Sequence, residues 1–278
     1  MSIYEEMIKD KIRDIRRDYD IGNKCGRSFF SIVENLKLKN ESPLSLFRLP
    51  FNENDVSGFV GYKNDKYVIF TNTSRNLGYE IFTLAHEIYH LLENDTDIRA
   101  EVVIEESEKY RIDSDEVADM FAAELLIPEN SLKVDFTRLK KESKTHHPDF
   151  QIIIQLQQEY YVEYKAITNR LREIGLIDKK CEDELNSILL NDELEILTKK
   201  LGYTNLLNQP SNEVHLPKRL LISVKENYER GEIDFDDLSV IFSYCNMTPE
   251  DFGYNQDENL SSSAKQFLDE LSKELESD

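Results

Sequence analysis

The sequence predicts an α+β fold. In it, a small antiparallel sheet packs with a histidine-bearing helix and a carboxylate-bearing helix, and an all-helical C-terminal region follows. Two observations predict this class. Three short runs with many apolar residues lie within residues 44–71, separated by turn-forming residues. Helical patterns of apolar residues precede this segment and continue after it. Strands segregated from helices in this way are typical of the α+β class.

The first elements follow in order along the chain. Residues 1–18 have the pattern of an amphipathic helix, and a second helix is expected at residues 28–38. The apolar residues expected to face inward on the first helix are Ile3, Met7, Ile8, Ile12 and Ile15. The strands are expected at residues 44–49, 56–62 and 66–71, with residues 63–65 as a hairpin connection between the last two.

Helical patterns also fill the second half of the sequence. They predict helices at residues 130–141, 149–158, 162–174, 183–201, 217–230, 234–245 and 261–275. No chemical motif appears after about residue 177, so we expect a first domain at residues 1–177 and a helical partner or sensor domain at residues 178–278. Within this second part, residues 209–212 (QPSN) are the clearest break.

The motif that carries chemistry is H-E-x-x-H, within residues 82–92 (FTLAHEIYHLL). His86 and His90 are four residues apart, so on a helix they project from the same face, one turn apart. Two neutral imidazoles at this spacing can bind one zinc ion and leave places for a third protein ligand and a water. Glu87 lies beside the first histidine, where a carboxylate can accept the proton of that water.

A third ligand is expected on a second helix downstream, within residues 115–128 (DEVADMFAAELLIP). Asp115 and Asp119 share one face of this helix, and small alanines beside them allow a close approach to the histidine helix. Asp115 would complete the coordination, with Glu116 as the alternative ligand. Asp119 would orient a histidine through its other ring nitrogen. An ordinary amphipathic helix with an acidic face is the simpler interpretation of the same residues.

The segments FTLAHEIYH and ADMFAAELLIP together resemble the ImmA/IrrE family of zinc metallo-endopeptidases. The family pattern is F-T-x-A-H-E-x-G-H, then E-x-x-A-[ND]-x-F-A-A-x-L-L-M-P. The resemblance is specific over about residues 45–130 and extends to about residue 177. Two residues depart from the pattern: Tyr89 replaces the glycine before the second histidine, and Asp115 replaces the usual glutamate ligand. The shorter aspartate requires the two helices to lie closer together.

Composition limits the possible partners. The formal net charge is −21, which repels phosphates and anionic membrane surfaces, so we expect neither direct nucleic-acid binding nor membrane binding. Basic residues on the helix at residues 162–174 leave a DNA-reading helix as a less favoured alternative. Three cysteines without a C-x-x-C pair, and a charged N-terminal segment, predict a cytoplasmic protein with reduced thiols.

These observations predict a cytoplasmic endopeptidase that uses one zinc ion and Glu87 as its general base. The donor to the oxyanion is left open among Tyr89, His146 and His147. The family resemblance implies a regulatory protein as substrate, typically a helix-turn-helix repressor cleaved in a stress response. The alternative is a non-catalytic, zinc-stabilised module that binds a repressor. The sequence does not specify the oligomeric state.

Overall fold

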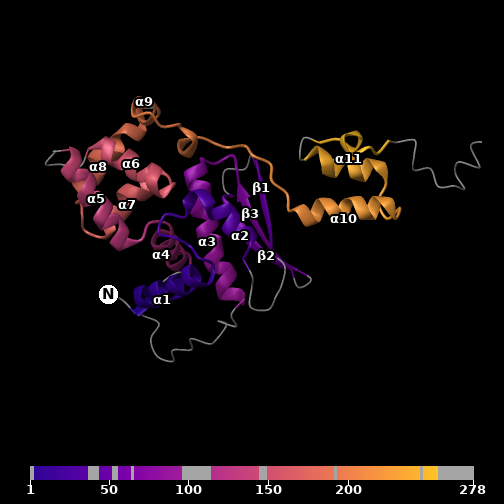
Figure 1. Cartoon of the computed structure of the whole chain (residues 1–278), viewed down its shortest axis with the longest axis horizontal. Helices are drawn as coiled ribbons and strands as arrows, with labels where there is room; N and C mark the ends of the chain where they lie inside the picture. The colour runs from indigo at the N-terminus through magenta and orange to yellow at the C-terminus, as the bar shows by residue number, and fades with distance from the viewer. Residues whose placement is uncertain are drawn as a thin grey trace, which may run out of the picture. The chain divides into compact units, whose positions relative to one another are not determined.

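The structure is a computed structural model, and it describes residues 3–36, 44–51, 56–63, 66–95, 114–143, 149–190, 193–244 and 247–255. It divides into two compact units, Met1–Glu213 and Val214–Asp278. The sequence-based division lay after residue 177, before two further helices that belong to the first unit. Figure 1 shows the elements and their order.

The sheet in the first unit has three strands, β1 (Leu44–Leu49), β2 (Gly58–Lys63) and β3 (Lys66–Asn72), in the order β1-β3-β2. β2 and β3 pair in antiparallel fashion, whereas β1 and β3 are parallel. The α+β class is confirmed, but the prediction of a wholly antiparallel sheet was wrong. The hairpin reverses the chain between β2 and β3, and β3 then lies between the other two strands, running in the direction of β1.

The long helix α3 (Leu77–Asp95) packs on one face of this sheet. Its apolar residues repeat at helical spacing, and Ile81, Leu84 and Leu91 are fully buried. They share one core with Leu46 of β1 and Ile69 of β3. The core therefore fixes the rotation of α3 about its own axis, which decides where its polar residues point.

Helix α4 (Ser114–Leu126) packs along α3. Ala118 and Ala122 are both fully buried, as expected where two helices approach closely. Helix α1 (Ile3–Asp18) packs on α4 in turn, through Ile8, Ile12 and Ile15. Met7 was expected to face inward but is 57% exposed, because it lies about 100° around the helix from Ile8.

The remaining helices of the first unit follow the predicted order. They are α2 (Phe29–Glu34), α5 (Glu129–Ser143), α6 (Phe150–Tyr160), α7 (Tyr164–Glu173), α8 (Lys179–Asn186) and α9 (Glu193–Lys200). Short 3₁₀ turns lie at Gly26–Ser28, Ser187–Leu190 and Leu206–Asn208. The single helix expected at residues 183–201 is therefore interrupted. Buried Leu185, Ile188 and Leu194 join this part to the same core.

After these helices the chain returns to the sheet. We call residues 209–213 the strap. The amide of Leu77 donates to the carbonyl of Gln209 (3.1 Å), and the amide of Asn212 donates to the carbonyl of Thr73 (3.0 Å). Thr73 Oγ1 also donates to the carbonyl of Glu213 (2.9 Å). The strap thus holds the segment that leads from β3 into α3.

The second unit contains α10 (Lys218–Glu229), α11 (Phe235–Ser243) and a 3₁₀ turn at Pro249–Phe252. Its own small core consists of Val224, Tyr228, Leu238 and Phe242. Asp234 and Asp237 form a capping box at the start of α11, in agreement with the predicted helix start. The helix expected at residues 261–275 lies outside the described residues.

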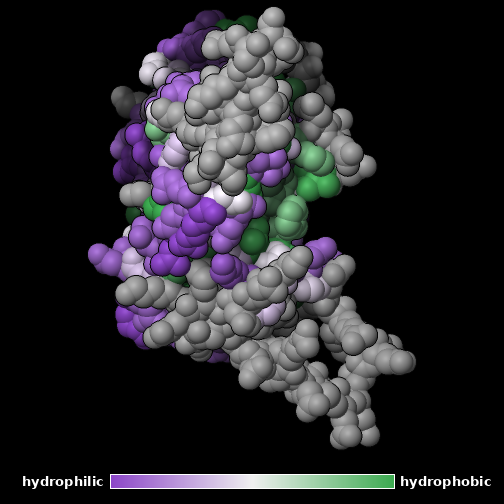
Figure 2. All heavy atoms as spheres, turned by 90° about the vertical axis from the view of Figure 1, so that its right-hand side faces the viewer, coloured by the Kyte–Doolittle hydropathy of each residue, from purple (hydrophilic) through white to green (hydrophobic). Residues whose placement is uncertain are grey.

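Hydrophilic residues cover much of the described surface on the face shown in Figure 2, with a separate group of hydrophobic residues at one margin. This surface agrees with the acidic composition. Among the described helices, none combines the length and the apolar character that crossing a bilayer requires.

Candidate metal centre and cleft

Helix α3 presents both motif histidines on one partly exposed face. The side chains of His86 and His90 are 20% and 22% exposed, while their helix neighbours Ile88 and Leu91 are buried. The two Nε2 atoms lie 3.1 Å apart. The helical spacing of the motif therefore brings the two imidazole nitrogens within reach of one ion.

Asp115, in the first turn of α4, meets these imidazoles. Its Oδ1 lies 3.4 Å from Nε2 of His90 and 4.0 Å from Nε2 of His86. In a tetrahedral zinc site with bonds of about 2.0–2.1 Å, ligand atoms are about 3.4 Å apart. The three observed separations bracket this value, so the donor set fits a zinc ion. Among the described residues, this is the group of histidine, cysteine and carboxylate side chains with ligand atoms close enough to share an ion.

Asp119 contacts the other nitrogen of His86, with Oδ1 at 2.8 Å from Nδ1. This hydrogen bond is the main cause that raises the pKa of His86. A proton on Nδ1 that is donated to the carboxylate leaves the Nε2 lone pair directed at Asp115 and His90. Asp119 therefore selects the ring tautomer that can bind a metal.

Glu87 projects from α3 next to His86 and is 9% exposed. Burial raises the pKa of its carboxyl group, and His86 opposes this effect. Gly58, the first residue of strand β2, lies next to the Glu87 side chain. A Cβ atom on Gly58 would lie 3.4 Å from Cγ of Glu87 and only 2.6 Å from Cγ2 of Thr83. Glycine at this position therefore lets the start of β2 approach Glu87 and α3 closely.

A cleft of about 790 Å³ opens beside these residues. Its walls come from the start of β2, from α3, from α4 and from α7. They include Ser57, Gly58, Tyr79, Phe82, Thr83, His86, Glu87, Asp115, Glu116, Asp119, Met120, Ala123, Glu163, Ala166, Asn169, Arg170 and Glu173. Glu116, the alternative third ligand, thus lines the cleft, but it is absent from the group of converging donor atoms.

The structure describes Tyr89, one of the three candidate donors to the oxyanion, and places it outside the cleft lining. The ring of Tyr89 packs against Phe121 at 5.6 Å and His90 at 5.7 Å, with Lys11 at 5.0 Å from its centroid. It does not line the cleft. His146 and His147 lie outside the described residues.

The sequence left α7 open as a DNA-reading helix, but in the structure this helix packs into the core and lines the cleft. Ile167 and Leu171 are buried in the core, while Glu163, Ala166 and Arg170 line the cleft. This wall of the cleft was not predicted from the sequence. The spacing of Glu163, Ala166 and Arg170, at i, i+3 and i+7, is the signal that could have shown it, because these positions share one helix face.

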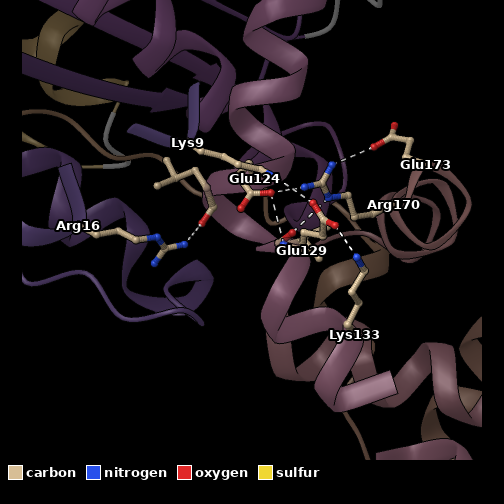
Figure 3. A network of polar contacts seen from close by, with 9 residues as sticks. Lys9, Arg16, Glu124, Glu129, Lys133, Arg170 and Glu173 are labelled. Atoms are coloured by element: carbon tan, nitrogen blue, oxygen red, sulfur yellow. Dashed lines mark hydrogen bonds and ion pairs between the residues drawn. The ribbon is translucent and has the colours of Figure 1, made fainter. Parts of the chain in front are cut away.

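A network of ion pairs joins α7 to the C-terminal end of α4. Arg170 forms an ion pair with Glu124 and a second with Glu173 at 3.3 Å (Figure 3). In the same view, Glu129 binds Lys9 of α1 at 2.9 Å and also contacts Lys133. Lys9, Glu124, Glu129, Arg170 and Glu173 of this network line a second cavity of about 550 Å³, which shares Met120, Arg170 and Glu173 with the cleft. The network fixes the α7 wall relative to the helix that bears Asp115.

A buried ion pair, also missed by the sequence analysis, lies at the start of α3. Arg48 of β1 contacts Glu80 through Nε (2.8 Å) and Nη2 (3.2 Å), and Thr71 Oγ1 donates to Glu80 at 2.9 Å. Arg48 Nη1 also contacts Glu213 of the strap at 2.8 Å. A charged residue in an apolar strand and another in an apolar helix stretch were the available signals.

Comparison with known proteins agrees with this geometry. The family model of the IrrE N-terminal-like domain matches residues 40–172, which include the three strands, α3, α4 and almost all of α7. None of the curated proteins matches the chain. The matched family is one of metallopeptidases, so a metal, typically zinc, is implied. Residues 40–172 therefore match the ImmA/IrrE family, in agreement with the resemblance carried by the motifs at residues 82–92 and 115–128.

Proposed function

We propose that this protein is a zinc-dependent endopeptidase that hydrolyses a peptide bond in a regulatory protein, with a helix-turn-helix repressor as its substrate. The observation that carries this proposal is the convergence of His86, His90 and Asp115 at the edge of a cleft that Glu87 also lines. Two imidazoles and a carboxylate form a donor set typical of catalytic zinc.

His86, His90 and Asp115 would hold the ion. When bound by these residues, zinc would lower the pKa of a water ligand and polarise the scissile carbonyl. Glu87 accepts a proton from the attacking water and passes it to the leaving amine. Because its carboxylate is largely desolvated, Glu87 is a stronger base than an exposed glutamate. Asp119 keeps Nδ1 of His86 protonated throughout.

Strand β2 is the element that would present the substrate. β3, the strand directly before α3, is central and pairs on both sides, so it has no free edge for a peptide. β2 lies at the edge of the sheet, and its first residue, Gly58, borders Glu87. An extended peptide that pairs with the outer edge of β2 would bring its backbone along the cleft.

The net negative charge of this chain supports a helix-turn-helix repressor as the substrate. Such proteins bind DNA through basic surfaces, and this chain has a net charge of −21. We propose that the protein acts in the cytoplasm, where thiols such as the free, buried Cys25 stay reduced.

The test is to incubate the purified full-length chain and zinc with repressors encoded beside it, with and without a chelator. We expect cleavage that the chelator abolishes. Glu87→Gln should keep its zinc but lose activity by about 100-fold or more, the usual contribution of a general base. Glu184→Gln, on the exposed surface of α8, is the matched control. Tight binding of the repressor without cleavage would favour the non-catalytic module instead.

A further inference from the structure

The end of the cleft beside the first turns of α3 contains an aromatic surface and a carboxylate. Tyr79 and Phe82 line it from α3, Ser57 lies against Tyr79 with its Oγ at 3.4 Å from the phenol oxygen, and Glu163 lines it from the start of α7. We call these four residues the α3 pocket. Tyr79 precedes His86 by seven residues, which is about 10 Å along the helix axis.

The backbone holds Glu163 in this position. A Cβ atom on Gly78 would lie 2.4 Å from the amide nitrogen of Glu163, so α3 and the start of α7 touch directly here. The side chain of Asn76 hydrogen-bonds the Glu163 carboxylate. Burial raises the pKa of Glu163, and the exposed Lys165 opposes this only in part. The carboxylate has therefore lost much of its water.

A carboxylate beside two aromatic rings fits a long cationic side chain. The methylene stem of a lysine or arginine can lie along the rings, and its charged end can reach the carboxylate. An acidic side chain would be repelled, because Glu116, Asp119 and Glu173 also line the cleft. Arg170, the basic lining residue, is already paired with Glu124 and Glu173.

We propose that the α3 pocket is a specificity pocket for a lysine or arginine side chain of the substrate, with Glu163 as its charged contact. This inference rests on the proposed peptidase function. An extended peptide advances about 3.3–3.4 Å per residue, so the recognised residue lies within about three residues of the scissile bond.

The first test measures cleavage by the zinc-loaded full-length protein of a library of internally quenched peptides that vary near the scissile bond. Peptides with lysine or arginine at one position should be preferred. Glu163→Gln should lower kcat/KM for these peptides by about tenfold or more, mainly through KM, because one charge-assisted hydrogen bond is lost. Peptides with glutamine there should be unaffected. Glu163→Lys should turn the preference towards acidic residues. An unchanged profile would overturn the proposal.

The second test needs no catalysis. N-acetyl-arginine amide is titrated into the full-length protein with Glu87→Gln, and binding is followed by calorimetry. Adding Glu163→Gln should weaken binding by about tenfold, whereas the exposed Glu184→Gln should not change it. Thermal melts of all variants check the fold. Absence of cleavage in the first test argues against the peptidase, whereas absent binding, or equal binding with and without Glu163→Gln, refutes the pocket.

Discussion

Arg48 and Glu80 form a buried ion pair that joins the first strand of the sheet to the first turns of α3, the helix that bears the two motif histidines. Their closest atoms are 2.8 Å apart, and the side chains are 7% and 0% exposed. The guanidinium of Arg48 also lies over the ring of Phe30, at 3.6 Å from its centroid. The pair therefore fixes where α3 starts relative to the sheet.

Arg48→Met should destabilise the protein strongly, because it leaves Glu80 charged and without its guanidinium in the interior. We expect a loss of about 3–5 kcal/mol in the free energy of unfolding, the usual cost of removing one partner of a buried pair. Urea denaturation measures it. The double variant Arg48→Met/Glu80→Leu should recover much of the loss. Equal losses in the single and double variants would show that the charge of Glu80 is not the cause.

Asp115→Asn should lower zinc affinity, because the amide oxygen is a weaker ligand than the carboxylate whose Oδ1 lies 3.4 Å from Nε2 of His90. Glu116→Gln should keep a full equivalent of zinc, since Glu116 does not belong to the converging group. Metal analysis after dialysis measures both. The reverse result would make Glu116 the third ligand. Loss of zinc in neither variant would remove α4 from the site.

Asp119→Asn should weaken zinc binding by about 10–100-fold, the effect expected when the carboxylate that orients a histidine ligand is replaced. The geometric reason is the 2.8 Å contact with Nδ1 of His86. Competition with a chromophoric chelator measures the affinity. Asp183→Asn, on the exposed surface of α8, is the control. Unchanged affinity would mean that the ring orientation of His86 is fixed by packing alone.

Gly78→Ala should destabilise the first unit by about 1–3 kcal/mol, the usual cost of overpacking. The new Cβ would lie within 2.4–2.7 Å of backbone atoms of Val162 and Glu163, which cannot move as a side chain could. Thermal denaturation measures the loss. Gly61→Ala is the matched control, because nothing lies within 4 Å of the position its Cβ would take. Similar melting temperatures for both variants would contradict the close contact between α3 and α7.

Glu129 should make stability depend on acid pH. Hydrogen bonds from Lys133 and Lys9 lower its pKa to about 2, below its unfolded value of about 4.3. The contribution is therefore present above about pH 4.3 and is lost as the pH falls towards 2. Glu129→Gln should cost about 1 kcal/mol or less at neutral pH, since the pair is partly exposed. Urea denaturation should show this difference closing at low pH. A constant difference would contradict the prediction.

The parts of the fold and site that depend on local spacing could be predicted from the sequence. His86 and His90 follow from one turn of a helix, and Asp115 followed from an acidic helix face with small neighbours. Apolar periodicity placed most helices and all three strands. These patterns extend over few residues, so the sequence displays them directly.

The remaining features depend on contacts between distant segments. Arg48 and Glu213 are 165 positions apart, and no local pattern links them. The parallel pairing of β1 could not be read from the strands, since either direction buries Leu46 equally well. The α3 pocket arises only where Gly78 meets Glu163. The amphipathic patterns of α8 and α9 likewise do not specify with which of the two cores these helices pack.

The strap also bears on how this protein can be divided experimentally. Residues 209–213 hydrogen-bond Thr73 and Leu77, and Glu213 binds Arg48. A fragment cut at residue 172, where the family match stops, would expose the faces of α6 and α7 that pack on α9 and α8, and would release the segment that leads into α3. A fragment meant to keep the first unit intact should therefore end no earlier than Glu213, 41 residues beyond the matched segment.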